Sequence, residues 1–221
     1  MNQPRSMYSK PIQFLYRLNY RAFIRENIEK NDHVLEIGSG LGFMKPLVIA
    51  EGAFYKGIEP IESVHKISKK LYGKECFFNE QLEKNCNDDV SFNKILSITV
   101  LDEINDKASF VEKIKSYCNN ETKILLAVRN ADFPFRRGTK VTSSFNNVTT
   151  NDLSYGEWIK LFNSLNLRIL SVNKINRPLL TSLTLDGGVK NILIRFLDLF
   201  LSLKKNYMLC FILSFKDIDR I

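Results

Sequence analysis

The sequence has few of the residues that build metal centres and redox sites. It contains only 2 histidines and 4 cysteines in 221 residues, and no pair of cysteines has the spacing of a zinc site or a dithiol motif. Its start, MNQPRSMYSKPIQ, lacks the apolar core of a signal peptide. We therefore expect no metal site, and reduced or buried thiols in a cytoplasmic protein.

Long runs of like charge are also absent. The net charge is +8, but the basic residues are scattered and do not interleave with aromatic residues, which argues against a nucleic-acid partner. The charge alone keeps RNA open as a partner. With 44% hydrophobic and 25% charged residues, the composition is that of a soluble globular protein, and the length suits one well-cored domain.

Short apolar strands alternate with helical patterns along the chain. Strands are expected at 33–37, 54–59, 76–78, 92–99, 123–128, 167–172 and 207–215. Helices are expected at 11–29, from the glycine turn to 51, and at 62–72, 103–117, 154–165 and 192–203. This alternation predicts a parallel sheet covered by helices on both faces.

We expect a single domain, because no repeat, low-complexity segment or linker divides the chain. Its expected parts are a helical cap over 1–29, a binding core over 30–175, a helical insert over 176–206, and a last strand with a tail over 207–221. The segment 131–153 is expected to be a long loop, of a length that usually serves a function.

Three glycines, Gly38, Gly40 and Gly42, directly follow an apolar strand and open a helix. Glycine lets the backbone turn sharply and lets a ligand approach without a Cβ in the way. A dinucleotide fingerprint would need its third glycine at position 43, where the chain has Phe43. Glu36 before the turn would repel a pyrophosphate but suits a cation. The pattern favours S-adenosylmethionine, which carries an ammonium and a sulfonium.

A second acid, Glu59, ends the second expected strand. A carboxylate at that strand end has two acceptor oxygens and can bind both hydroxyls of a ribose. Together with the glycine turn, Glu59 therefore predicts a nucleoside site at the carboxyl ends of the strands.

Four segments carry a family resemblance. VLEIGSGLGF at 34–43, GIEP at 57–60, SFNKILSITVLDEI at 91–104 and ETKILLAVRN at 121–130 resemble motifs of class I S-adenosylmethionine-dependent methyltransferases. The resemblance covers residues 30–175, and YMLCFILSFK fits the family's final strand. It implies an α/β fold, a Rossmann-like three-layer sandwich whose seven-stranded, mostly parallel sheet has an antiparallel last strand. It also implies S-adenosyl-L-methionine as the cofactor.

The resemblance implies a role for each matching residue. Glu36 and the glycine turn would hold the methionine part, Glu59 the ribose, and Ile61 would pack on adenine. Asn79 or Glu80 would reach the adenine amino group, and the residues after the fourth strand would line the pocket beside the sulfonium. The implied cofactor set is Glu36, Gly38, Ser39, Gly40, Gly42, Phe43, Glu59, Pro60, Ile61, Asn79, Glu80, Thr99 and Val100.

The motifs that the sequence lacks exclude several classes of methyl acceptor. No N-P-P-Y or D-P-P-Y segment follows the fourth strand, no cysteine ends strand four or five, and Glu103 stands where the family often has histidine. We therefore assign no catalytic base and expect methylation of an oxygen or nitrogen atom of a small molecule, a sugar or a lipid-linked intermediate. Two alternatives stay open: an RNA methyltransferase, which rests on the net charge, and a non-catalytic, cofactor-binding partner subunit with this fold. The expected substrate residues are Arg129, Asn130, Arg136, Arg137 and Tyr155.

The apolar segment 189–205 is too short to span a bilayer. Three alternatives stay open for it: a buried core helix, a dimer contact, or a helix lying at the inner membrane face. The last of these makes a lipid-linked acceptor attractive.

Overall fold

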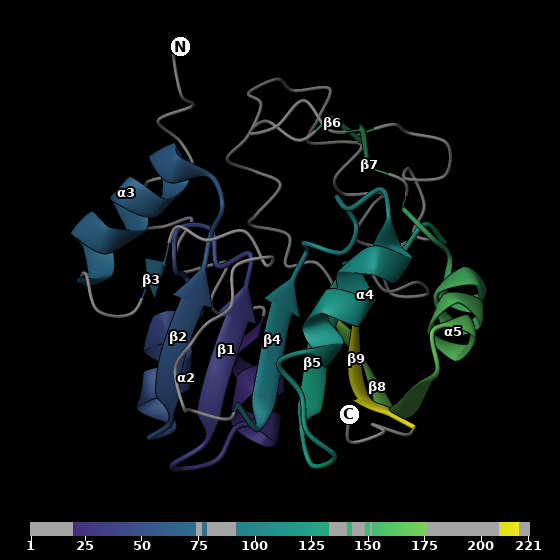
Figure 1. The fold of residues 1–221 in the computed structure, drawn as a ribbon, viewed down its shortest axis with the longest axis horizontal. Coiled ribbons are helices and arrows are strands. Elements are labelled where there is room, and N and C mark those ends of the chain that lie inside the picture. Colours follow the sequence, from purple (N-terminus) through teal and green to yellow (C-terminus); the bar gives the residue numbers. More distant parts are fainter. Residues whose placement is uncertain are drawn as a thin grey trace, which may run out of the picture.

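In the computed structural model, the residues described are 20–73, 77–78, 92–132, 141–142, 149–150, 152–175 and 208–216. For the pairs 77–78, 141–142 and 149–150 the description covers the backbone alone. One twisted sheet runs through the centre, with helices packed on both of its faces (Figure 1).

Seven strands form this sheet in the order β3-β2-β1-β4-β5-β9-β8. They are β1 (His33–Ile37), β2 (Phe54–Ile58), β3 (Phe77–Phe78), β4 (Lys94–Ile98), β5 (Lys123–Arg129), β8 (Leu167–Ile175) and β9 (Met208–Phe215). The strands from β3 to β5 pair in parallel, whereas β9 is antiparallel to both β5 and β8. The predicted sheet, with its antiparallel last strand, is confirmed.

The two faces of the sheet carry separate cores because strand side chains alternate between the faces. On one face α4 (Lys107–Lys115) and α5 (Tyr155–Ser164) pack, with Trp158 and Phe162 fully buried against Phe211 of β9. On the other face the helical residues 20–27 and α2 (Lys45–Ala50) pack against β1, β2 and β4. A further helix, α3 (Glu62–Tyr72), follows β2 and contacts β3.

Several predicted boundaries are wrong. The helix predicted from 103 begins at Lys107, because the Asp106 side chain accepts the Ser109 amide at 2.9 Å and caps the helix there. β8 continues to Ile175, because its pairing with β9 extends to that residue. The segment predicted as a plain loop over 131–153 contains a two-stranded hairpin of β6 (Val141–Thr142) and β7 (Thr149–Thr150).

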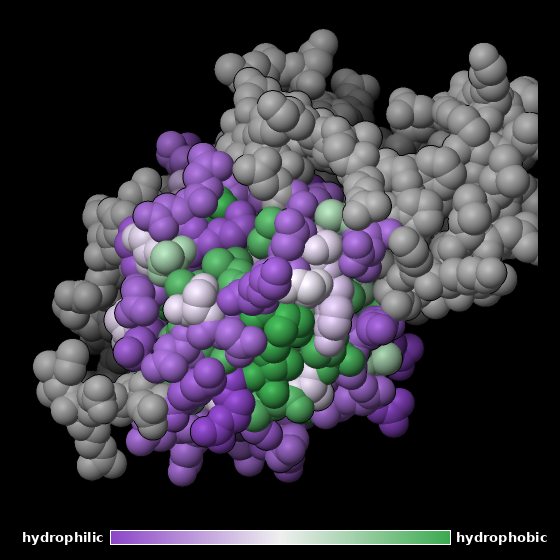
Figure 2. All heavy atoms as spheres, turned by 90° about the vertical axis from the view of Figure 1, so that its right-hand side faces the viewer, coloured by the Kyte–Doolittle hydropathy of each residue, from purple (hydrophilic) through white to green (hydrophobic). Residues whose placement is uncertain are grey.

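The side of the molecule that carries β8 and α5 is mostly hydrophilic around an apolar area (Figure 2). Among the described residues of these two elements, Leu170 on β8 and Tyr155 on α5 are the exposed large hydrophobic ones. Leu170 stands at an irregularity in the β8–β9 register, between Ile169 and Ser171. A bulge of this kind distorts an edge strand and hinders pairing with another chain.

None of the described helices is long and apolar enough to cross a membrane. The predicted helix over 192–203, and with it the segment 189–205, lies outside the described residues.

Candidate functional site

The glycine turn lies between β1 and α2, at the carboxyl edge of the sheet. Gly38, Gly40 and Gly42 all adopt positive φ angles, of 69°, 53° and 78°, which L side chains adopt at a cost. A Cβ on Gly38 would also lie 2.3 Å from Cγ2 of Val100, whereas a Cβ on Gly40 would meet nothing within 4 Å. The turn is therefore closed toward β4 and open where Gly40 lies.

Glu59 joins this turn to the end of β2. Its carboxylate accepts hydrogen bonds from the amides of Gly40 and Ile61, both at 2.9 Å. Burial raises the pKa of Glu59, the two amides lower it, and the charge of Glu103 raises it. Since each carboxylate oxygen has two acceptor sites, Glu59 can hold the turn and still accept hydroxyl groups.

Glu36 lies in β1, just before the turn, and is buried. The Tyr55 hydroxyl donates a hydrogen bond to its Oε2. Burial raises the pKa of Glu36 to about 8, the hydrogen bond from Tyr55 lowers it, and the charge of Glu59 raises it. Gly57, the β2 partner of Glu36, leaves room for this arrangement, because a Cβ there would lie 2.8 Å from the Tyr55 hydroxyl and 2.9 Å from Ser39 Oγ.

Thr99 and Val100 follow β4 and lie beside the glycine turn, as the contact between Val100 and Gly38 shows. Thr99 has a φ of 59°, which is rare and strained for a β-branched residue. Its amide donates to the Ala127 carbonyl at 2.8 Å, and this bond holds the strained backbone against β5.

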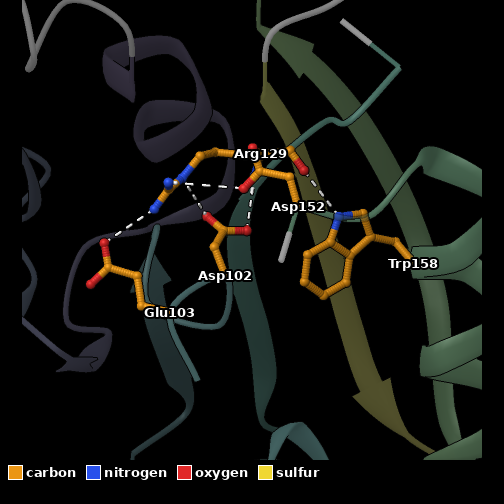
Figure 3. Close-up of polar contacts among 5 residues, drawn as sticks. All are labelled: Asp102, Glu103, Arg129, Asp152 and Trp158. Atoms are coloured by element: carbon orange, nitrogen blue, oxygen red, sulfur yellow. Dashed lines mark hydrogen bonds and ion pairs between the residues drawn. The ribbon is translucent and has the colours of Figure 1, made fainter. Parts of the chain in front are cut away.

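Arg129, at the end of β5, is the centre of a buried ion-pair network (Figure 3). Its guanidinium lies 3.2 Å from Asp102 Oδ2, 3.1 Å from Glu103 Oε1 and 3.9 Å from Asp152 Oδ1. Its amide donates to Asp102 Oδ1, and its carbonyl accepts from Trp158 Nε1, both at 3.0 Å. The network ties the turn after β4 to the end of β5 and to α5.

Three of the predicted substrate residues make contacts within the protein. The Arg129 guanidinium faces three carboxylates, so its fork is engaged inside the protein rather than offered to a substrate anion. Asn130 is buried, and its Oδ1 accepts the Asp132 amide at 3.1 Å within a turn. The Tyr155 ring stacks on Phe211 of β9 at 6.3 Å, three strands away from β1.

The remaining predicted site residues divide into two groups. Phe43, Pro60 and Ile61 lie next to the glycine turn and Glu59 in the chain, and each keeps some exposure. Four predicted residues lie outside the described residues: Asn79, Glu80, Arg136 and Arg137.

Sequence reasoning missed the residues that support the site. Tyr55 and Gly57 lie on the same side of β2 as each other, and Gly57 pairs with Glu36. Asp102 and Asp152 received no role, and Glu103 entered only as the residue at the position where the family often has histidine. The available signal was the cluster of polar residues just after two apolar strands, where the edge of a parallel sheet collects them.

The carboxyl edge of the sheet is consequently acidic. Within the described residues, no group of three or more His, Cys, Asp or Glu is placed to hold a metal ion. Because anionic surroundings favour a positively charged ligand, this edge suits a cationic cofactor. Among the described residues, the acids near this edge are Glu36, Glu59, Asp102, Glu103 and Asp152, and Arg129 forms ion pairs with the last three.

Comparison of the sequence with known families identifies one over most of its length. The methyltransferase domain family matches residues 13–170. No curated protein sequence matches the chain significantly.

Solved structures share the fold. One is a methyltransferase in complex with the Haloferax volcanii Trm112 methyltransferase activator, with a TM-score of 0.72, 12% identity, and coverage of 98% of this chain and 96% of that chain. The S-adenosylmethionine-dependent methyltransferase from Mesorhizobium loti has a TM-score of 0.64, 12% identity, and coverage of 90% and 99%.

A third similar structure is the plantazolicin methyltransferase BpumL, in complex with a triazolic desmethylPZN analog and S-adenosylhomocysteine (SAH). Its TM-score is 0.62 at 15% identity, with 96% of this chain and 89% of that chain covered. The family match and the sheet order agree with the motifs in the sequence. The chain belongs to the methyltransferase domain family, with the class I fold and S-adenosylmethionine as the methyl donor of that class.

Proposed function

We propose that this protein is an S-adenosylmethionine-dependent methyltransferase that acts on an oxygen or nitrogen atom of a small molecule, a glycan or a lipid-linked intermediate. The observation that carries this proposal is the pairing of an open glycine turn with two acids. Gly40 leaves space above the turn, Glu59 holds the turn from β2, and Glu36 lies in β1 just before it.

The residues of this edge fit the cofactor by chemistry. Ser39 Oγ is buried and has no hydrogen-bond partner among the described residues, so a polar ligand group can satisfy it. When bound, S-adenosylmethionine supplies a methyl group activated by its sulfonium charge. Glu59 would hold the ribose, and Glu36 with the glycine turn would hold the methionine part. Thr99 and Val100 would fix the side of the pocket, since methyl transfer depends largely on alignment.

Two observations support the proposed class of methyl acceptor: the acidic residues at this edge of the sheet, and the motifs that the sequence lacks. The acidic edge disfavours an acceptor whose reacting atom lies beside a phosphate or carboxylate. No N-P-P-Y segment for a base or amide nitrogen follows β4. A neutral hydroxyl or an amine of a metabolite, glycan or lipid intermediate fits both observations.

Transfer of tritium from S-adenosyl-[methyl-³H]methionine tests the proposal. The protein is incubated with separated small-molecule, lipid and RNA fractions of a bacterial extract. We expect label in the small-molecule or lipid fraction, and none with Glu59→Ala. Label confined to RNA would support the alternative of an RNA methyltransferase, and binding of SAH without any transfer would support a non-catalytic partner subunit.

A membrane-bound acceptor has its own test. The segment 189–205 ends in Lys204 and Lys205, and paired lysines beside an apolar stretch favour anionic lipid surfaces. If this segment binds membranes, the protein should sediment with phosphatidylglycerol vesicles. A variant with both lysines changed to glutamate should remain in the supernatant. Absence of wild-type sedimentation would remove the membrane proposal and leave the methyltransferase proposal intact.

A further inference from the structure

Glu103 differs from the other two acids that surround Arg129. The side chains of Asp102 and Asp152 are 0% and 4% exposed, whereas that of Glu103 is 30% exposed. Glu103 contacts Arg129 through Oε1 alone, which lies 3.1 Å from Nη2. Its second oxygen, Oε2, has no hydrogen-bond partner within the part of the chain that the structure describes. Glu103 therefore has a carboxylate oxygen that can bind a ligand, while the side chains of Asp102 and Asp152 are closed off from solvent.

Glu103 also lies next to the glycine turn. Its amide donates to the Val100 carbonyl at 2.8 Å, and Val100 is the residue that a Cβ on Gly38 would meet at 2.3 Å. Figure 3 shows Glu103 at the opposite end of the network from Trp158. The charge of Glu103 raises the pKa of Glu59, after the larger effects of burial and of two amides. Glu103 thus lies close to the place proposed for the cofactor.

The cations near Glu103 do not neutralise it fully. Arg129 shares its single positive charge among three carboxylates. Lys107 lies near the same network, where burial lowers its pKa and the charges of Asp102 and Asp152 raise it. Lys107 therefore compensates these two acids rather than Glu103. A cationic group of a ligand would be attracted to Glu103, and an anionic group would be repelled.

An amine acceptor fits this charge pattern. As the acceptor nitrogen takes the methyl group, a bond forms between nitrogen and the methyl carbon. The bond between the methyl carbon and sulfur breaks, and its electron pair goes to sulfur, so the positive charge passes from sulfur to nitrogen. A carboxylate beside the nitrogen attracts it more strongly in the transition state than in the neutral amine, which lowers the barrier. The surplus proton of the product ammonium leaves to the solvent.

We propose that Glu103 binds the methyl acceptor, and that this acceptor is an aliphatic amine whose N–H donates to Oε2. The inference rests on the proposed function and narrows its acceptor from a hydroxyl or an amine to an amine. Glu103 is a catalytic residue in this scheme, because it touches the attacking group. Arg129 is a positioning residue, because it holds Oε1 and leaves Oε2 to the acceptor.

Blocking the amines of a substrate pool tests the class of acceptor. The small-molecule and lipid fractions of a bacterial extract are each divided, and one half is acetylated at its amines with N-hydroxysulfosuccinimide acetate. Both halves are incubated with S-adenosyl-[methyl-³H]methionine and the wild-type protein. We expect label in the untreated half alone. Equal label in both halves would indicate a hydroxyl acceptor, which would overturn the inference and leave the proposed function intact.

Three variants test the role of Glu103. Glu103→Gln should transfer label to the untreated half roughly 10- to 100-fold more slowly, because a hydrogen bond to a charged acceptor is lost, and should bind SAH as the wild type does. Glu103→Asp keeps a carboxylate and should recover part of the lost rate. Glu121→Gln is the control, because Glu121 is exposed and lies just before β5, at the opposite edge of the sheet. This control should transfer label at the wild-type rate.

The variants separate an acceptor role from a structural one. Transfer by Glu103→Gln at the wild-type rate would overturn the inference, and so would equal rates for Glu103→Gln and Glu103→Asp. An equal fall of SAH binding and of transfer in Glu103→Gln would assign Glu103 to the support of the cofactor site, and would also overturn it. Absence of transfer by the wild type to either half would overturn the proposed function together with the inference.

Discussion

Replacing Arg129 with methionine should destabilise the protein far more than removing an exposed cation. The Arg129 side chain is 10% exposed and faces Asp102 and Asp152, whose side chains are 0% and 4% exposed. Methionine fills similar volume but removes the guanidinium that faces these buried carboxylates. Breaking a buried ion pair in this way costs about 3–5 kcal/mol.

That loss is large compared with the total free energy of unfolding. A domain is stable by about 5–15 kcal/mol, and for a chain of this size the loss corresponds to a fall in Tm of roughly 10 °C. The deficit should depend on pH. A buried carboxylate that has lost its ion-pair partner destabilises the fold when it is ionised and not when it is protonated. The difference from the wild type should therefore shrink between pH 8 and pH 5.

Thermal and urea unfolding at both pH values measure the effect. Lys66→Met is the matched control, because Lys66 is 70% exposed and pairs with Glu62 across one helical turn, where a pair is worth at most about 1 kcal/mol. The double variant Arg129→Met with Asp102→Leu should recover part of the lost stability. A loss below about 1 kcal/mol for Arg129→Met, with the same value at pH 5 and pH 8, would refute the assignment of the network as a buried structural element.

Four further predictions concern the glycine turn, α5 and a thiol. Gly38→Ala should lower the free energy of unfolding by about 1–2 kcal/mol because of the positive φ alone, and by more because the new Cβ would contact Val100. Gly156→Ala, where a Cβ meets nothing within 4 Å, should leave the free energy of unfolding unchanged or raise it by up to about 1 kcal/mol, and a urea midpoint below that of the wild type would contradict this. Ser154→Ala should lower the free energy of unfolding by about 1 kcal/mol, because it removes the capping box of α5. Unchanged stability would mean that the cap is not formed. Burial raises the pKa of Cys210 to about 12, so iodoacetamide should not label it at pH 8 unless the protein is unfolded, and mass spectrometry of native protein would detect the contrary.

The sheet could be predicted because its signals are local. Each strand is a short apolar run, and the glycines at 38, 40 and 42 mark the turn without reference to distant residues. The start of α4 was misplaced because apolar spacing continues from 103, whereas the cap at Asp106 decides where the helix begins. Hydrophobic periodicity carries no information on such a cap.

The role of Arg129 could not be predicted in the same way. In the sequence alone, an arginine after an apolar strand is as consistent with binding a substrate anion as with forming an ion pair inside the protein. Its partners are 27 residues away at Asp102 and on a different element at Asp152, and only the fold brings them together. Likewise, the sequence alone presents Tyr55 as an ordinary aromatic residue of a strand, and only the structure shows that its hydroxyl donates to Glu36 Oε2.

The central claim is that the glycine turn and Glu59 bind the nucleoside of S-adenosylmethionine. Calorimetric titration with SAH of the wild type, Glu59→Gln and Glu62→Gln tests it most directly. Glu62 is three residues away but 66% exposed and paired with Lys66, so it controls for the change of charge. We predict saturable binding by the wild type and by Glu62→Gln, and a loss of about tenfold or more for Glu59→Gln, as expected when hydrogen bonds to a charged acceptor are lost. Equal affinity of all three proteins, or no binding by the wild type at millimolar SAH, would contradict the claim.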